Sequence, residues 1–302
     1  MGVNNRIFCF GEVLWDEVDG AEFPGGAPLN VAYHMAKDNR FDVYMVSSVG
    51  NDAAGKKMRS LIDDWSINAR FIQSNDDYPT GRVVANVSDR ANVTYDILQP
   101  VAWDHIQENA DLNACFPENA CLIFGSLACR NSVSKQTLLN LLSKRCMRVF
   151  DINLRGNYYD RQTLSTLLSR TDLLKINEEE LAEVTSIFQP ASARAPEQVQ
   201  LRALMGRFGI KETIVTRGAD GASYYTFDEQ VDVAGITVPV ADTIGCGDAF
   251  LAAFLRHRLG GATVEAALSH AVLTGAFIAK QPGGCPAYAL ADLEAFAEDK
   301  LK

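Results

Sequence analysis

Short apolar runs, rich in β-branched and aromatic residues, recur along the first two thirds of the chain. They cover residues 7–10, 43–49, 122–124, 148–152, 173–176 and 212–216. Between many of them, apolar residues return at the spacing of one helix face, over 53–65, 134–142, 163–168 and 196–208. This alternation predicts an α/β fold, a mostly parallel sheet with helices on both faces. From residue 249 onward the pattern is mainly helical and includes 264–280 and 290–300.

Two segments depart from this alternation. Residues 80–88 and 92–98 are strand-like on either side of a short turn at 89–91, which predicts a hairpin. Residues 12–24 show no regular spacing of apolar residues and are rich in turn residues. The Ala- and Pro-rich stretch 189–196 is predicted to be a loop between two helices.

Composition narrows the class of protein. A chain of 302 residues fits one large domain or two smaller ones. The net charge of −10 argues against nucleic acid as a partner, although local amides, a few cations and Mg²⁺ can still bind ATP. The seven cysteines are odd in number and form no Cys-x-x-Cys pair, so they are expected to be reduced. With no signal-peptide pattern and no apolar run of about 18 residues, a cytoplasmic protein away from membranes is expected.

The segment 242–250, DTIGCGDAF, places two glycines and an acid directly before a long apolar run. Gly245 and Gly247 have no Cβ, so the backbone can turn tightly and approach a ligand. The run 249–259 predicts a buried helix, whose first N–H groups form an anion site. Asp248 stands beside that site, where a carboxylate can accept a proton during phosphoryl transfer to a hydroxyl. The alternative is an acid that only caps the helix.

Two further polar segments are candidates for binding a polyhydroxyl ligand. The segment 25–30, GGAPLN, follows Asp16 and combines a flexible backbone with hydrogen-bonding groups. Alone, it is equally well a glycine turn before a helix. The segment 151–155, DINLR, lies at the carboxyl end of a predicted strand, where open α/β sheets bind ligands. Arg155 could hold an anionic or polyhydroxyl group there, or a salt bridge could form at the strand end.

Two other segments have recognisable local patterns. Residues 177–180, NEEE, have the spacing of a helix capping box. Residues 216–221, TRGADG, form a glycine-containing loop after a strand. By contrast, 50–57 is nearly a P-loop, but Lys57 stands where a Ser or Thr would have to hold Mg²⁺. The turn at 245–250 lacks the third glycine of a dinucleotide fingerprint.

These segments, in this order along the whole chain, resemble the signatures of the ribokinase-like carbohydrate kinases, also called the phosphofructokinase-B family. The signature Asp-Thr-x-Gly-Ala-Gly-Asp matches 242–248 except at Cys246. The segments YPTG at 78–81, VAWD at 101–104 and FGSLA at 124–128 look most like the fructokinase branch. The resemblance implies a single ribokinase-like domain over 1–302, a three-layer sandwich with a small β lid formed by about 12–24 and 78–100.

The resemblance also implies roles for individual residues. Asp248 would be the catalytic base, and the anion hole would be formed by the amides of Gly245, Cys246 and Gly247. The expected sugar-binding residues are Asp16, Gly26, Asn30 and Arg155. The expected nucleotide-binding residues are Asn177, Glu180, Thr216, Gly218, Gly221, Gly245 and Gly247.

The implied cofactor is Mg²⁺ as MgATP, held near Glu180 through water. Many members of the family also bind a monovalent cation such as K⁺, largely through backbone carbonyls, and Asp242 is the candidate side chain here. Lids in this family often pair, so a homodimer is one expected assembly. A thiol at a helix N-terminus has a lowered pKa where solvent reaches it, so Cys246 is expected to be reactive if it is accessible, and bound MgATP is expected to shield it.

The function implied is an ATP-dependent sugar kinase that phosphorylates a primary hydroxyl, with D-fructose converted to fructose 6-phosphate. Other acceptors stay open, namely ribose, 2-keto-3-deoxygluconate or a nucleoside. The carboxylate of a ketodeoxy acid would need a cation, for which Arg82, Arg90 or Arg155 is available. A sugar-sensing protein without catalysis is the alternative from another class, and the intact Asp248 counts against it.

Overall fold

The computed structural model describes residues 5–18, 20–86 and 94–300, and within them one large sheet and one small sheet. Across the large sheet the strands are β13 (Gln230–Ala234), β12 (Gly221–Tyr225), β11 (Glu212–Thr216), β10 (Leu173–Asn177), β9 (Met147–Asp151), β8 (Cys121–Phe124), β1 (Arg6–Phe10), β4 (Asp42–Gly50) and β5 (Asn68–Asn75). From β5 to β11 all neighbours are parallel, whereas β12 and β13 pair antiparallel at one edge. The predicted mostly parallel sheet is confirmed.

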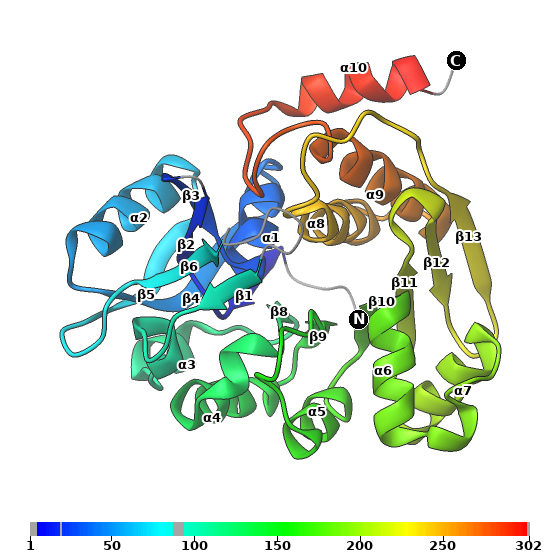
Figure 1. Ribbon diagram of the computed structural model, residues 1–302, viewed down its shortest axis with the longest axis horizontal. Helices are drawn as coiled ribbons and strands as arrows, with labels where there is room; N and C mark the ends of the chain where they lie inside the picture. The colour runs from blue at the N-terminus through cyan, green and yellow to red at the C-terminus, as the bar shows by residue number, and fades with distance from the viewer. Residues whose placement is uncertain (1–4, 19, 87–93, 301–302) are drawn as a thin grey trace.

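Helices cover both faces of this sheet. They are α1 (Ala27–Ala36), α2 (Ala53–Asp64), α3 (Ala110–Cys115), α4 (Ser132–Leu142), α5 (Arg161–Leu168), α6 (Glu178–Phe188), α7 (Glu197–Phe208), α8 (Cys246–Leu259), α9 (Val264–Ile278) and α10 (Leu290–Lys300), with the short 3₁₀ turns η1 (Ala102–His105), η2 (Leu127–Arg130), η3 (Pro190–Ser192) and η4 (Gly218–Asp220). Figure 1 shows α3 to α7 along one face and α1, α8 and α9 on the other. Within the described residues, no helix combines the length and apolar character needed to cross a membrane.

The alternation of side chains along each strand divides the apolar residues between two cores. In β1, Ile7 and Cys9 belong to the core beneath α1, α8 and α9, whereas Phe8 and Phe10 belong to the core beneath α3 to α7. Successive residues of a strand point to opposite faces. A strand buried on both faces therefore appears as a continuous apolar run, which explains why the runs in the sequence do not alternate.

The smaller sheet has the order β3 (Ala21–Gly25), β2 (Leu14–Val18), β6 (Gly81–Asn86) and β7 (Thr94–Ile97). β2 pairs antiparallel with β3 and parallel with β6, and β6 pairs antiparallel with β7. The turn-rich segment 12–24 thus holds two strands that its composition did not predict. The predicted hairpin strands are present, and its turn at 89–91 lies outside the described residues.

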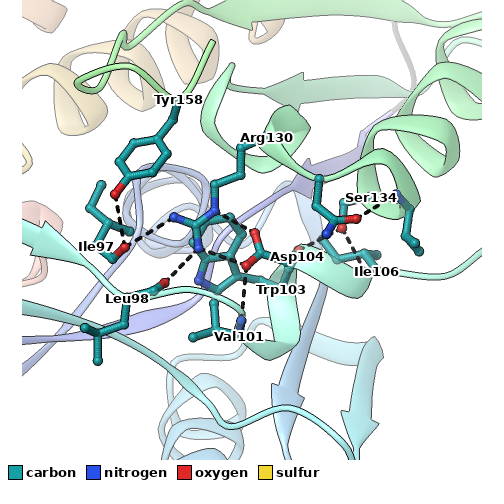
Figure 2. A network of polar contacts seen from close by, with 11 residues as sticks. Ile97, Leu98, Val101, Trp103, Asp104, Ile106, Arg130, Ser134 and Tyr158 are labelled. Atoms are coloured by element: carbon teal, nitrogen blue, oxygen red, sulfur yellow. Dashed lines mark hydrogen bonds and ion pairs between the residues drawn. The ribbon is translucent and has the colours of Figure 1, made fainter.

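The return from the small sheet to the main body is anchored by Arg130 at the end of η2. Its guanidinium pairs with Asp104 (Nε–Oδ1 2.7 Å) and also donates to the backbone oxygen of Leu98 (2.8 Å). It lies 3.9 Å from the centroid of the Trp103 ring. Figure 2 shows Arg130 between the Asp104 carboxylate and the end of β7, where Tyr158 also contacts Ile97. The small sheet is therefore held at its base by a buried ion pair.

The strand order places polar residues at one edge of the large sheet. β1 lies between β4 and β8, so the chain winds outward in two directions from it, and ligands bind at the carboxyl ends beside such a reversal. Glu12 follows β1, Asp151 ends β9, Asn177 ends β10 and Thr216 ends β11. These residues, far apart in the sequence, meet at a single crevice.

Candidate active site

A cavity of about 620 Å³ lies at this edge, between the two sheets and the start of α8. Most of the residues predicted to be functional line it, namely Asp16, Gly26, Asn30, Arg155, Asn177, Glu180, Thr216, Gly245, Gly247 and Asp248. Four others do not line it, namely Cys246, Gly218, Gly221 and Asp242. The roles of all of them stay predictions.

The start of α8 has the geometry of an anion site. Gly245 precedes the helix with φ of +74°, in the left-handed region that favours glycine. The first amides of a helix have no partner within it, and no side chain caps α8. Asp248 lies in the first turn without capping it, so the interpretation of this acid as a helix cap is wrong.

Asp248 is buried at the wall of the cavity, with 9% of its surface exposed. Its Oδ2 accepts a hydrogen bond of 2.8 Å from Asn30 Nδ2. Burial and the nearby charge of Asp151 raise the pKa of Asp248 to about 6, while Lys175, the Asn30 hydrogen bond and Arg155 act in the opposite direction. The carboxylate is therefore charged at neutral pH and more basic than an ordinary aspartate, as a general base requires.

Asn30 reaches Asp248 because of the turn that begins α1. Gly26 has φ of +110°, and a Cβ there would lie 2.3 Å from the backbone oxygen of Glu12. Asn30 lies in the first turn of α1, where its Oδ1 accepts a contact of 3.2 Å from the thiol of Cys285. Both ends of the amide are thus held, and the segment 25–30 is at once a glycine turn before a helix and a wall of the cavity.

Two more acids on this side of the cavity have raised pKa values. Burial raises the pKa of Asp16 to about 6, with Arg155 opposing the change and Asp242 adding to it. Burial raises the pKa of Glu12 to about 7, and the charge of Asp248 adds to the effect. Glu12 Oε2 is buried without a hydrogen-bond partner among the described residues. Glu12 was not among the predicted site residues, although its place directly after β1 was a usable signal.

Among the described residues, Arg155 forms no salt bridge at the strand end, and Asp151 pairs instead with Lys175, at 2.8 Å. Lys175 also lines the cavity, and sequence reasoning missed it because it lies inside an apolar run. A lysine in the middle of a buried strand was the signal that could have identified it. Arg155 is exposed at the mouth of the cavity.

Asn177 and Glu180 form the capping box that their spacing predicts. Asn177 Oδ1 accepts from the Glu180 amide (2.8 Å), and Glu180 Oε2 accepts from the Asn177 amide (3.0 Å). Glu180 Oε1 accepts from the amide of Leu154 (2.9 Å). Because amides already contact both oxygens, a metal held through water fits Glu180 better than one bound directly.

The donor set suits a divalent cation bound mainly by nucleotide phosphates. No group of three or more His, Cys, Asp or Glu side chains arranged around a metal position occurs in the part of the chain that the structure describes. Carboxylates on the cavity wall nevertheless provide hard oxygen ligands, and Mg²⁺ commonly keeps several waters and binds through substrate phosphates.

Asp242 and the glycines of 216–221 have structural tasks of their own. Asp242 accepts amide hydrogen bonds from Ile244 (3.0 Å) and Gly283 (2.9 Å), and so ties two loops together. Gly218 and Gly221 have φ of +52° and +98°, and a Cβ at Gly221 would lie 2.1 Å from the Val233 oxygen. Their roles toward K⁺ and nucleotide stay predictions.

The lowered pKa considered for Cys246 is contradicted. Its thiol is half-buried and lies 3.8 Å from the backbone oxygen of Asp242, in the loop before α8. Burial, with the charges of Asp242 and Asp248, raises the pKa of Cys246 to about 11. Desolvation thus outweighs the helix N-terminus, which would have favoured the thiolate.

Cys246→Ala is therefore expected to keep turnover within about 3-fold of the parent, because the proposed anion hole uses only the backbone amide at this position. Steady-state kinetics of the variant measures this. Thiol reagents at neutral pH are expected to label Cys246 slowly, with or without nucleotide. A large loss of turnover in Cys246→Ala would give the thiol a role that its position does not explain.

A large, mostly parallel sheet with flanking helices, a small second sheet and an acid beside a glycine turn together define a ribokinase-like kinase. Residues 4–289 match the sequence model of the pfkB family carbohydrate kinases, and the chain belongs to this family. It is a phosphotransferase that acts on a sugar hydroxyl, and the family implies ATP and a divalent metal.

Individual relatives differ in the acceptor that they are named for. The chain is 26% identical to a probable chloroplastic fructokinase-6 of Arabidopsis thaliana, over 98% of this chain and 82% of the relative. It is 25% identical to an aminoimidazole riboside kinase of Salmonella typhimurium, over 84% of this chain and 81% of the relative. Among solved structures, the fructokinase of Vibrio cholerae O395 with bound fructose, ADP and calcium is 26% identical with a TM-score of 0.83, covering 96% of this chain and 98% of that one.

Proposed function

We propose that this protein transfers the γ-phosphoryl group of ATP to the 6-hydroxyl of D-fructose. The observation that carries the proposal is Asp248, buried beside the first amides of α8 and hydrogen-bonded to Asn30 at the wall of the cavity. The fructokinase names of relatives, and the fructose in the related solved structure, support this acceptor.

In the proposed reaction, the primary hydroxyl of the sugar gives its proton to Asp248. The hydroxyl oxygen bonds to the γ-phosphorus while the bond from that phosphorus to the β,γ-bridging oxygen breaks, and its electron pair leaves with ADP. The amides of Gly245, Cys246 and Gly247 are proposed to stabilise the charge that develops on the transferred group. Mg²⁺, when bound, supplies further charge neutralisation, and Asn177 and Glu180 are proposed to hold it through water.

The remaining site residues are assigned by their match to the family signatures. We propose that the sugar is bound by Asp16, Gly26, Asn30 and Arg155, and that Thr216, Gly218 and Gly221 contact the nucleotide. Asp242 is proposed to border a K⁺ site formed mainly by backbone carbonyls. The chain is proposed to be one domain whose small sheet closes over the sugar, in a cytoplasmic protein able to pair through that sheet.

Another acceptor is the second candidate function. The relative named for aminoimidazole riboside supports a nucleoside, and ribose or 2-keto-3-deoxygluconate would also present a primary hydroxyl. Measured ATP turnover with fructose, ribose, 2-keto-3-deoxygluconate and a nucleoside separates these proposals. If kcat/KM is highest with fructose, the result supports fructose as the acceptor. If turnover occurs only with another acceptor, that acceptor replaces fructose in the proposal.

Asp16→Ala is expected to raise the KM for the sugar, or lower its kcat/KM, by about 10- to 100-fold and to affect the KM for ATP much less. Losing one partner leaves a buried polar group unsatisfied, at a cost of about 1–3 kcal/mol. Steady-state kinetics with each substrate varied in turn measures the difference.

Glu17→Ala is the matched control on the same strand. Glu17 is the next residue of β2, so its side chain points away from the cavity, and its Oε2 lies 3.7 Å from Arg82 Nη1. Its loss should therefore leave the KM values for the sugar and for ATP unchanged. Equal effects of Asp16→Ala on sugar and ATP would instead indicate a folding defect.

A further inference from the structure

Lys175 is a charged residue in the middle of a buried strand. It lies in β10, where Leu174 and Ile176 point into the core beneath α6 and α7. Lys175 points to the opposite face, as Asn177 does two residues further along, and both line the cavity. Only 10% of its side chain is exposed. An ammonium buried in this way costs several kcal/mol unless its surroundings compensate.

Asp151 provides most of that compensation. Lys175 Nζ donates to both carboxylate oxygens of Asp151, at 2.8 and 2.9 Å. Burial lowers the pKa of Lys175, but the charges of Asp151, Asp248 and Glu180 outweigh it and hold the pKa above its usual value. The group is therefore an ammonium at neutral pH. It has three N–H donors, and Asp151 occupies two of them.

The ammonium lies against the glycine turn at the start of α8. A Cβ built on Gly247 would be 3.2 Å from Lys175 Nζ and 3.7 Å from its Cε. The positive charge therefore shares a wall of the cavity with the first amides of α8 and with the positive end of the helix dipole. Glycine at 247 leaves room for the ammonium beside the backbone.

This cavity needs cations to accept a nucleotide. Its lining contains seven acidic side chains, namely Glu12, Asp16, Asp151, Glu179, Glu180, Glu183 and Asp248. Only Lys175 and Arg155 among its described lining residues are basic, and Arg155 lies exposed at the mouth. Lys175 is thus the one buried cation in the described lining that can face a phosphate beside Asp248.

We propose, building on the proposed function, that Lys175 is a further catalytic residue whose third N–H binds the phosphoryl group as it moves from ATP to the sugar. The attraction between a fixed ammonium and that group strengthens as negative charge develops on the group. The ammonium also needs no reorganisation during the reaction. The sugar oxygen forms its bond to the γ-phosphorus, the bond to the bridging oxygen breaks toward ADP, and Asp248 keeps the hydroxyl proton. Asp151 is a positioning residue that holds the ammonium against Gly247.

Lys175→Met tests the proposal by two readouts. We expect kcat to fall about 100-fold, the loss typical of one transition-state donor, with less than about 3-fold change in the sugar KM. By titration calorimetry, we expect the preference for β,γ-imido-ATP over ADP to fall about 10-fold, because only the triphosphate reaches the ammonium. Lys175→Arg should keep most of that preference.

The double variant Asp151→Asn/Lys175→Met removes both charges and so leaves no unpaired buried carboxylate. If the pair served only to hold the fold, the double variant would recover near-parental turnover, which would overturn the proposal. We expect it to stay as slow as Lys175→Met. An unchanged preference for β,γ-imido-ATP in Lys175→Met would also overturn it.

The binding readout keeps this inference separate from the choice of sugar. If the parent protein phosphorylates another acceptor, that acceptor replaces fructose in the kinetic test. If it phosphorylates none of the panel, the proposed function fails, and the ratio of β,γ-imido-ATP to ADP affinity still decides the role of Lys175.

Discussion

Asp248→Asn is expected to slow phosphoryl transfer by about 10²- to 10⁴-fold while sugar binding stays largely intact. The amide keeps the shape of the side chain and can still accept the hydrogen bond from Asn30, but it cannot take a proton. It also removes a negative charge that stands near Asp151, so the fold should not be weakened. Steady-state turnover, together with sugar binding by calorimetry, measures both parts.

Asp160→Asn is the matched control, because Asp160 is an acid at the start of a helix that does serve as a cap. Its Oδ1 accepts from the amide of Thr163 at 2.8 Å, at the N-terminus of α5. Asparagine caps helices about as well as aspartate, so turnover should be unchanged.

The parent should lose kcat/KM as the pH falls through about 6, because protonated Asp248 cannot act as a base. Near-parental turnover of Asp248→Asn would show that Asp248 is not the general base.

The main sheet could be predicted because its strands are buried on both faces. Runs such as 7–10 and 122–124 are apolar at every position, since each face of the sheet packs beneath helices. Two of the strands that were missed, β13 and β3, lack this property. β13 alternates between exposed and partly buried positions at the sheet edge, and β3 contains Pro24 and is mostly exposed. Pro and acidic residues are unfavourable in strands, so local sequence favoured turns there.

The turn and helix start at 245–248 could be predicted from the sequence. Gly245 to Asp248 form a turn and a helix start that local residue types specify. The contact between Asn30 and Asp248 joins residues 218 positions apart, and only the folded chain brings them together. Lys175 and Glu12 carried only a weak sequence signal, because their importance arises largely from neighbours supplied by other strands.

Gly245→Ala is expected to lower turnover about 100-fold, although the residue contributes no side chain. Its φ of +74° disfavours any Cβ, and that Cβ would lie 2.5 Å from the Cα of Gly284. The loop at Gly284 packs against the Asn30 amide, since a Cβ on Gly284 would be 2.7 Å from Asn30 Nδ2. Relief of the clash therefore moves the group that holds Asp248, and a shift of about 1 Å in a catalytic group costs about 10²-fold.

Gly209→Ala separates this effect from backbone strain. Gly209 ends α7 with φ of +71°, nearly the same as Gly245, and an added Cβ meets nothing within 4 Å. Both variants should lose about 1–2 kcal/mol of stability in thermal unfolding, from the left-handed backbone alone. Only Gly245→Ala should lose activity, because only there does the Cβ displace the wall of the cavity. Equal turnover of the two variants would show that the packing of Gly245 on Gly284 does not position Asp248.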